Sequence, residues 1–397
     1  MRHIPDTERR ARLAQRHALA PGHRAADPEA ATRAVTVLHS TEPATVYLSI
    51  RARVDGVTVD DVDRALYTDR SLVKQLAMRR TLFVFPRDLL PAAWGSASAR
   101  VATTLAARLA KEVEAAGLAD DGAAWLEEVR AAVLGVLEGE PALTAQQIRE
   151  RVPALEARLD LAPGKSYGVN VPIAPRVLSQ LGVEGRLARG DNTGHWRVSK
   201  PRWTTMETWL GDVPPPAKAD EGYAELVGRW LHSFGPGTED DIVWWLGATK
   251  SAVRAALSAI GAVEVSLDGG GRGWLNPDDV DPVDEVESWA ALLPVLDPTV
   301  MGWKQRDFYL GAHAPHLFDR NGNAGTTAWW DGRIVGCWVQ DDEGVVEVRP
   351  VERLPKGALT ALGAEAERLT AWLDGVRVGT VYPSTAMKAP TPWKVPR

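Results

Sequence analysis

The sequence contains one cysteine, Cys337, among its 397 residues. A single cysteine excludes an internal disulfide and any zinc site built on cysteine ligands. The eight histidines are scattered, and no two of them form a His-x-x-x-His pair. Because a metal site needs several ligands at close spacing, we expect no metal and no other cofactor.

Hydrophobic runs long enough to cross a membrane are also missing, because no stretch of about eighteen consecutive apolar residues occurs. The start, MRHIPDTERRARLAQRH, lacks the apolar segment of a signal peptide. We therefore expect a soluble, cytoplasmic protein that contacts no membrane.

The formal net charge of −6 argues against indiscriminate binding of polyanions, but the charge is distributed unevenly. Residues 1–24 carry six arginines and can form one helix or a loose tail, and residues 64–111 carry nine lysines or arginines. Residues 278–287, in contrast, carry six acidic side chains and no base. A basic N-terminal part in an acidic chain indicates a localised phosphate-binding face.

The stretch best suited to chemistry is residues 38–50, where polar side chains lie between two apolar runs. His39, Thr41 and Glu42 precede Pro43, so we expect them where a helix ends or bends. A histidine and a carboxylate three residues apart can reach one water, which the threonine hydroxyl can orient and Glu42 can deprotonate. The alternative is ordinary helix capping, for which Ser-Thr-Glu-Pro is equally suited.

The next segments predict a series of short elements. Asp27-Pro28-Glu29 is typical of a helix start, and residues 58–66 predict a capped short helix. Residues 69–80 predict a basic amphipathic helix, and residues 81–85 a strand ended by Pro86. This order is typical of a winged helix, although a generic α/β segment gives the same signals.

A pattern of apolar and threonine residues recurs ninety-four residues further along the chain. Each copy predicts a helix, a break, a threonine cap and a second helix, and the corresponding positions are Leu137, Thr144, Ile148 and Val152, then Leu231, Thr238, Ile242 and Leu246. A helix stopped by glycine and a hairpin follow each copy, over residues 177–196 and 253–274. These features describe a recognition helix and its wing, so we expect two such units, with residues 58–85 as a third. A chance match of apolar residues is the alternative.

A region of different character follows the acidic run. Residues 326–339 predict a hairpin around an Asp331-Gly332 turn, Val345–Val348 predict another strand, and Ala358–Leu373 predict a helix. Together they predict a small mixed β domain, and the chain length allows roughly three or four domains. We divide the chain into three winged-helix domains, the first with the candidate catalytic motif, and the C-terminal domain: 1–115, 116–212, 213–280 and 281–397.

A family resemblance is carried by four segments, Leu38–Val54, Met78–Leu82, Leu292–Pro298 and Trp330–Gly336. In this order they resemble the bacterial winged-helix DNA glycosylases of the AlkZ and YcaQ type, over nearly the whole chain. The resemblance implies an α+β fold of three tandem winged-helix units followed by a C-terminal β-barrel-like domain, which together surround duplex DNA. It also implies hydrolysis of the N-glycosidic bond of alkylated purines, including N7-linked interstrand crosslinks.

The sequence departs from the family's motif at the catalytic position. The family has Gln-x-Gln or Gln-x-Asp there, whereas the matching residues are His39-Ser40-Thr41, followed by Glu42-Pro43. The difference indicates either a branch with other catalytic groups or a member that binds DNA without excising a base. An N7-alkylated purine is cationic and leaves readily, so the enzyme has to stabilise positive charge on the sugar and supply water. We expect Glu42 to be the base or electrostatic stabiliser, His39 to position the water or contact the sugar-phosphate, and Thr41 to orient the water.

Contacts with the DNA backbone are expected from basic side chains, and the candidates are Arg51, Arg70, Lys74, Arg79, Arg80 and, by its position in the resemblance, Arg333. A solvated surface explains any single one equally well. We expect a monofunctional glycosylase that acts as a monomer on duplex DNA containing alkylated purines. The alternatives are a scaffold for protein interactions and a non-catalytic winged-helix regulator. The missing dimerisation heptads argue against a regulator, because a monomer reads a palindrome poorly.

Overall fold

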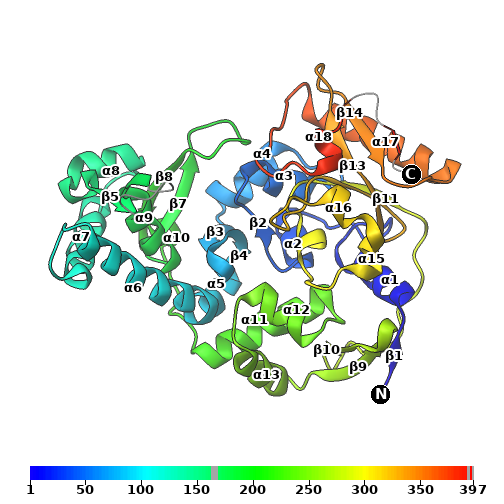
Figure 1. The fold of residues 1–397 in the computed structure, drawn as a ribbon, viewed down its shortest axis with the longest axis horizontal. Coiled ribbons are helices and arrows are strands. Elements are labelled where there is room, and N and C mark those ends of the chain that lie inside the picture. The colour runs from blue at the N-terminus through cyan, green and yellow to red at the C-terminus, as the bar shows by residue number, and fades with distance from the viewer. Residues whose placement is uncertain (162–168, 391–393, 396–397) are drawn as a thin grey trace. The chain divides into compact units, whose positions relative to one another are not determined.

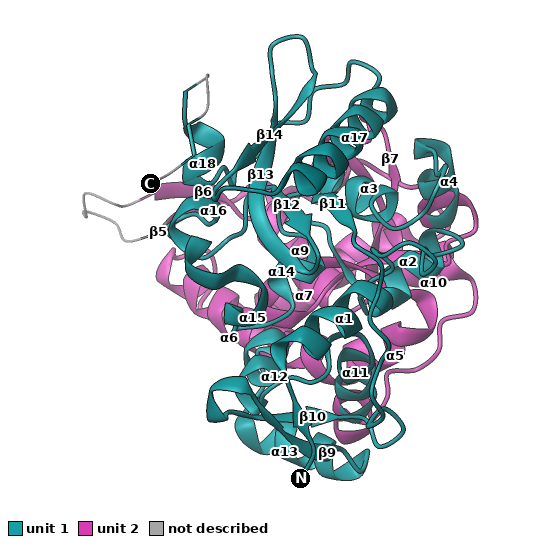
Figure 2. Cartoon of the chain, turned by 90° about the vertical axis from the view of Figure 1, so that its right-hand side faces the viewer, with its two compact units in different colours: residues 1–65, 224–397 teal, residues 66–223 magenta. Residues whose placement is uncertain are grey.

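A computed structural model describes residues 1–161, 169–390 and 394–395 (Figure 1). The chain forms two compact units, unit 1 with residues 1–65 and 224–397, and unit 2 with residues 66–223 (Figure 2). Unit 1 therefore combines both ends of the chain, whereas unit 2 is one continuous segment. The division into four domains remains a prediction, and residues 162–168 of its second part lie outside the described residues.

Unit 2 is mainly helical. Its helices and strands are β3 (Leu72–Leu76), β4 (Leu82–Pro86), α5 (Leu90–Ala93), α6 (Ala99–Ala115), α7 (Gly122–Leu137), α8 (Ala145–Arg151), β5 (Arg158–Leu161), β6 (Val169–Pro172), α9 (Ala174–Val183), β7 (Leu187–Asn192), β8 (Pro201–Thr205) and α10 (Met206–Leu210). Apolar side chains of α6 to α9 and of the β7–β8 hairpin form one buried core. Removal of this apolar surface from water is the main force that holds the helices together.

The predicted basic helix over residues 69–80 is wrong, because β3 is the first strand of a hairpin. It pairs antiparallel with β4, with Leu72 opposite Pro86 and Leu76 opposite Leu82. Arg79 and Arg80 lie in the turn with positive φ angles of 54° and 60°, which an α-helix does not contain. Pairing of two adjacent β-prone runs therefore overrides the helical spacing of the apolar residues. The strand predicted before Pro86 is confirmed as β4.

Unit 1 contains the remaining elements, which are β1 (His3–Ile4), α1 (Asp6–Arg16), α2 (Pro28–Ala34), β2 (Leu38–His39), α3 (Pro43–Arg51), α4 (Val59–Asp63), most of α11 (Ala219–Phe234), α12 (Glu239–Leu246), α13 (Lys250–Ala259), β9 (Val263–Leu267), β10 (Arg272–Leu275), β11 (Ala290–Leu293), α14 (Pro298–Met301), α15 (Asp307–Leu310), α16 (Ala314–Leu317), β12 (Thr327–Trp330), β13 (Arg333–Gln340), β14 (Val346–Pro350), α17 (Lys356–Leu373) and α18 (Thr385–Lys388). Two predicted helix starts are confirmed, because the side chains of Asp27 and Thr58 cap α2 and α4. The Arg-rich start is not one helix, since α1 ends at Arg16 and Ala18 has a φ of 54°.

The repeated helix–cap–helix pattern is present in the structure. Thr144 follows α7 and caps α8, and Thr238 follows α11 and caps α12. In both caps the threonine and the third residue of the new helix exchange hydrogen bonds, which satisfies amides at the helix start. Each copy continues into a further helix and a hairpin, α9 with β7–β8 and α13 with β9–β10.

The two hairpins turn at different places. The turn between β9 and β10 lies at residues 268–271, as the three glycines predict. The strand β8 begins only at Pro201, beyond the predicted end of the hairpin at Trp196. Asn192 explains the longer loop, because its side-chain oxygen accepts a hydrogen bond from the amide of Lys200 at 2.8 Å and its nitrogen donates to carbonyls within the loop.

The sheet of the C-terminal region is antiparallel, with four strands in the order β11-β12-β13-β14. The predicted turn at Asp331-Gly332 is confirmed, with φ angles of 46° and 77° that suit a two-residue hairpin turn. The helix α17 packs on this sheet (Figure 2). Among the described strands, β11 and β14 are the two edges of the sheet. The sheet is therefore open, so these strands form no closed barrel, and the β-barrel-like domain that the resemblance implies stays a prediction.

Candidate active site

Glu42 lies immediately before α3, which begins at Pro43. The prediction that a helix ends or bends here is therefore wrong, because α2 already ends at Ala34 and Pro43 starts the next helix. Proline suits the first position of a helix, since it has no amide hydrogen to leave unpaired. Although Glu42 occupies the capping position, its side chain makes no capping hydrogen bond. Helix capping consequently does not explain the carboxylate.

The carboxylate of Glu42 is held by the segment that follows α17. Its Oε1 accepts hydrogen bonds from the Thr380 hydroxyl at 2.8 Å and from the Val381 amide at 2.7 Å. The amide of Tyr382 donates to the Thr380 hydroxyl oxygen at 2.9 Å, so the hydroxyl hydrogen is directed at Glu42. Within the described part of the chain, Oε2 of Glu42 has no hydrogen-bond donor. One oxygen is thus fixed while the other remains available to a substrate or water.

Burial raises the pKa of Glu42, and the hydrogen bonds from Val381 and Thr380 counteract part of this effect. Both donors favour the ionised carboxylate, whereas the half-buried surroundings favour the protonated acid. Burial also raises the pKa of the Tyr382 hydroxyl, and the nearby carboxylates of Glu42 and Asp319 add to that rise. Tyr382 is therefore a neutral neighbour that leaves the charge of Glu42 uncompensated.

A small cavity of about 160 Å³ has Glu42 in its wall. Most of its wall is apolar, with Leu48 from α3, Val295, and Trp338 from β13 among the lining residues. This volume admits several water molecules. A mostly apolar cavity with a carboxylate in its wall can hold a water within reach of that carboxylate.

The position of α3 is fixed by hydrogen bonds on one face of the helix. Thr45 donates to the carbonyl oxygen of Val295 at 3.0 Å, and Ser49 donates to Oδ2 of Asp297 at 2.7 Å. Arg53, just beyond the helix, forms a fully buried ion pair with Asp297 at 2.8 Å. Hydrogen bonds and an ion pair therefore connect two of the segments that carry the family resemblance, 38–54 and 292–298. Together they set the direction in which α3 presents Glu42.

The other two predicted catalytic residues differ in exposure. His39 is half-buried, and its Nδ1 accepts a hydrogen bond from the backbone amide of Thr41 at 3.4 Å. The side chain of Thr41 is exposed. The structure thus brings the His39 ring to the backbone amide of Thr41, and the donors from Thr380 and Val381 go to Glu42.

The predicted DNA contacts divide into two groups. Arg70, Lys74 and Arg51 already have protein partners: Arg70 donates to Trp209 and lies over its ring, Lys74 donates to the Tyr67 hydroxyl, and Arg51 pairs with Glu365. Arg79, Arg80 and Arg333 have exposed side chains, and Arg333 also pairs with Glu352 at 3.7 Å. Arg79 and Arg80 follow β3 in unit 2, and Arg333 begins β13 in unit 1.

Sequence reasoning missed the residues that anchor the site. Thr380 and Val381 lie 338 and 339 residues from Glu42, so no local spacing connects them with it. The available signal was compositional, namely a C-terminal segment with bases and no acids after Gly375. The hydroxyl of Thr45 and the carboxylate of Asp297 could have been found only by pairing two motifs far apart in the chain.

The architecture is that of a class of DNA-repair enzymes, the DNA glycosylases. The DNA glycosylase AlkZ-like family matches residues 32–372, and the chain belongs to this family. The match ends before Thr380 and Val381. Among solved structures, the Streptomyces sahachiroi DNA glycosylase AlkZ is similar, with a TM-score of 0.73 and 20% identity over 94% of this chain and 98% of that chain. At this identity the likeness shows the fold.

No curated protein matches the sequence of this chain. Over the residues that the structure describes, no helix has both the length and the apolar character needed to span a membrane.

Proposed function

We propose that this chain is a monofunctional DNA glycosylase that acts as a monomer on alkylated purines in duplex DNA. Its substrates are N7-alkylguanine and, by extension, N7-linked interstrand crosslinks. The observation that carries the proposal is the carboxylate of Glu42, which is half-buried, does not cap its helix and has one oxygen anchored by two donors. Preorganised negative charge of this kind suits a reaction in which positive charge develops on a sugar.

The proposed reaction breaks the bond between the sugar C1′ and N9 of the purine. The bonding electrons move to the cationic purine, which leaves as a neutral base, and the sugar becomes oxocarbenium-like. The charge of Glu42 stabilises this state, and its Oε2 accepts a proton as water adds to C1′. His39 positions the water or the sugar-phosphate, and Thr41 helps to orient the water. The products are a free base and an abasic site in an unbroken strand.

We infer that the helical repeats are winged-helix units that bind the duplex. The order of helices and hairpins in α7–β8 and in α11–β10 supports this assignment, whereas in residues 58–85 the strand β3 occupies the position expected for a recognition helix. Exposure supports phosphate contacts by Arg79, Arg80 and Arg333 most directly. Arg51, Arg70 and Lys74 would have to share their present protein partners with a phosphate.

Incubation of the purified protein with duplex DNA containing N7-methylguanine, followed by alkaline cleavage of abasic sites, tests the activity. Strands should break only after alkali, because a monofunctional enzyme leaves the backbone intact. Glu42→Gln should retain affinity for DNA and slow excision by about 10² to 10⁴, the usual range for loss of an acid–base group. His39→Ala should slow excision less, and Thr41→Ala least.

Glu343→Gln is the matched control, because Glu343 is an exposed carboxylate of the same unit in the turn before β14. This variant should excise at the parental rate. Equal rates for Glu42→Gln and the parent, with His39→Ala inactive, would transfer the water-handling role to the histidine. Tight binding without any abasic product would favour the non-catalytic DNA-binding protein, to which the altered His39-Ser40-Thr41 motif also points.

A further inference from the structure

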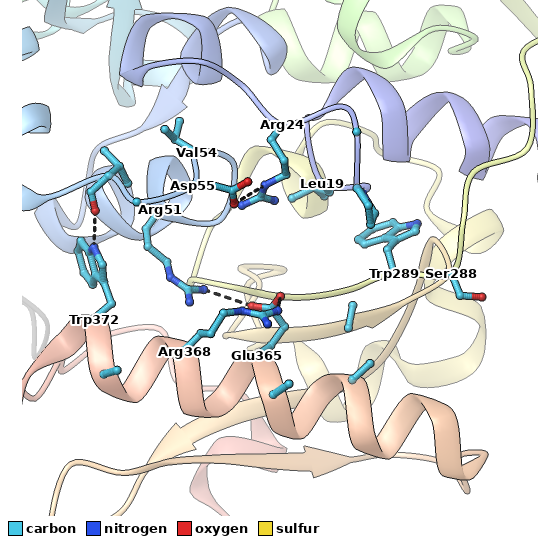
Figure 3. A pocket seen from close by; sticks show the side chains of 18 residues that line it. Leu19, Arg24, Arg51, Val54, Asp55, Ser288, Trp289, Glu365, Arg368 and Trp372 are labelled. Carbon is cyan, nitrogen blue, oxygen red and sulfur yellow. Dashed lines mark hydrogen bonds and ion pairs between the residues drawn. The ribbon is translucent and has the colours of Figure 1, made fainter.

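A second hollow in unit 1 lies away from the cavity beside Glu42 and shares no lining residue with it. Its volume is about 800 Å³, within the range of small-molecule sites. Four segments form its walls, namely residues 19–24, residues 51–57, residues 288–290 and one side of α17 (Figure 3). Small alanine side chains on α17 leave the space open.

Three arginines from separate parts of the chain line this hollow, and Figure 3 shows them with two carboxylates. Arg24 pairs with Asp55 at 3.1 Å, and Glu365 pairs with both Arg51 and Arg368. Three positive charges against two negative charges leave the hollow with an excess of +1.

Arg51 is the least satisfied of the three arginines. Its side chain is only 11% exposed, and its one hydrogen bond within the described residues is a long one, 3.5 Å to Oε2 of Glu365. A guanidinium has five N–H donors, so most of those on Arg51 have no protein acceptor among the described residues. Burial lowers the pKa of Arg51, the Glu365 carboxylate counteracts part of this effect, and the charges of Arg368 and Arg24 lower the pKa further.

Arg53 provides an internal comparison two residues further on. It is fully buried, and it makes four hydrogen bonds, to Ser49, to both carboxylate oxygens of Asp297 and to Thr299. The chain therefore supplies acceptors to one arginine at the end of α3 and leaves the other facing an open hollow. The N–H groups of Arg51 that no acceptor among the described residues takes are therefore open to an anionic ligand, which would form charge-assisted hydrogen bonds with them.

We propose that this hollow is a phosphate-binding site. In this site Arg51 contacts the ligand, and Arg24 and Arg368 add positive charge to the lining. A guanidinium matches phosphate oxygens through paired hydrogen bonds, and a multiply charged phosphate makes better use of three arginines than a carboxylate does. The phosphate belongs either to a free nucleotide or to the DNA backbone. This site does not depend on the chemistry proposed for Glu42, whereas its assignment to the DNA backbone rests on the DNA binding proposed above.

Isothermal titration of the full chain with pyrophosphate at constant ionic strength tests the site. The parent should bind saturably, and Arg51→Gln should lose about tenfold to a hundredfold in affinity, as expected for hydrogen bonds between charged groups. Arg353→Gln removes the same charge from an exposed position outside the hollow and should bind like the parent. If Arg51→Gln fails to fold, Arg368→Gln replaces it, because that side chain is 60% exposed.

Two further titrations identify the source of the phosphate. Binding of ADP that leaves the affinity for undamaged duplex unchanged indicates a free nucleotide. Competition between pyrophosphate and duplex, with weaker duplex binding by Arg51→Gln, indicates the DNA backbone. The proposal is overturned if the parent binds neither pyrophosphate nor ADP and Arg51→Gln retains parental affinity for DNA. Equal binding of pyrophosphate by the parent and Arg51→Gln also overturns it.

Discussion

Acid should destabilise unit 1 through His17, which is fully buried among partners that require its neutral form. Its Nε2 donates to the carbonyl oxygen of Ser233 at 3.1 Å, because a carbonyl can only accept. Its Nδ1 then accepts the hydroxyl of Thr299 at 2.8 Å, and Arg53 donates to that same hydroxyl at 2.7 Å. Burial, followed by repulsion from Arg53, lowers the pKa of His17 to about 3.

The unfolded chain binds a proton at His17 below a pH of about 6.5, whereas the folded protein does not. The stabilisation from neutral His17 is therefore complete above about pH 6.5. It is lost progressively as the pH falls towards the folded pKa of about 3. A shift of one pH unit is worth about 1.4 kcal/mol, so His17 alone should remove about 2 kcal/mol of unfolding free energy between pH 7 and pH 5.

Urea unfolding at several pH values between 5 and 7 measures this loss. His17→Gln keeps a donor and an acceptor but cannot titrate, so its free energy of unfolding should fall by about 2 kcal/mol less than that of the parent over this range. His23 is exposed in the same unit, and His23→Gln should show the parental pH dependence. An unchanged pH dependence in His17→Gln would refute the reasoning.

Three further predictions concern the site, the packing of unit 2 and DNA binding. Thr380→Val removes a hydrogen bond to ionised Glu42 and so raises the pKa of Glu42. In a pH profile of the excision rate, the fall on the acidic side should therefore move to higher pH, with little change in rate at pH 8. Gly95→Ala places a Cβ 1.9 Å from the Ala217 oxygen and should lower the melting temperature, whereas Gly135→Ala, which meets open space on α7, should not. Affinity for undamaged duplex should fall by about 10³ to 10⁵ between 50 and 200 mM salt if roughly six to ten phosphates are contacted. An affinity that does not change with salt would exclude these phosphate contacts.

Local patterns predicted the parts of the fold that local interactions determine. The caps at Thr144 and Thr238 and the turn at Asp331-Gly332 depend on residues within four positions of each other, and the structure contains all three. The basic helix was wrong because its outcome depended on a partner strand. Residues 72–76 had the spacing of a helix, but pairing with residues 82–86 supplied hydrogen bonds that a helix would otherwise have made internally.

In the candidate site, too, the sequence predicted only what local residues determine. Sequence alone selected Glu42, because an ionisable residue before a proline and between apolar runs is unusual enough to notice. It could not distinguish a carboxylate that caps its own helix from one held by a distant segment, since both have the same local pattern. The distinction depends on Thr380 and Val381, which the fold brings to Glu42 from the other end of the chain. The hollow around Arg51 was equally hidden, because Arg24 and Arg368 are distant in sequence.

The helix α3 should couple stability to activity, because Glu42 precedes it and the ion pair of Arg53 with Asp297 fixes its other end. Burial alone would raise the pKa of Asp297, but the attraction of Arg53 and the hydrogen bonds from Ser49 and Thr299 lower it overall. Asp297→Asn leaves the guanidinium buried without its countercharge, which should cost about 3–5 kcal/mol of unfolding free energy. Excision per folded molecule should fall as well, because α3 then loses the contact that directs it, whereas Thr380→Val should slow excision at low pH without this loss of stability. A destabilised Asp297→Asn with the parental rate per folded molecule would show that the bond from Thr45 to Val295 is sufficient to place Glu42.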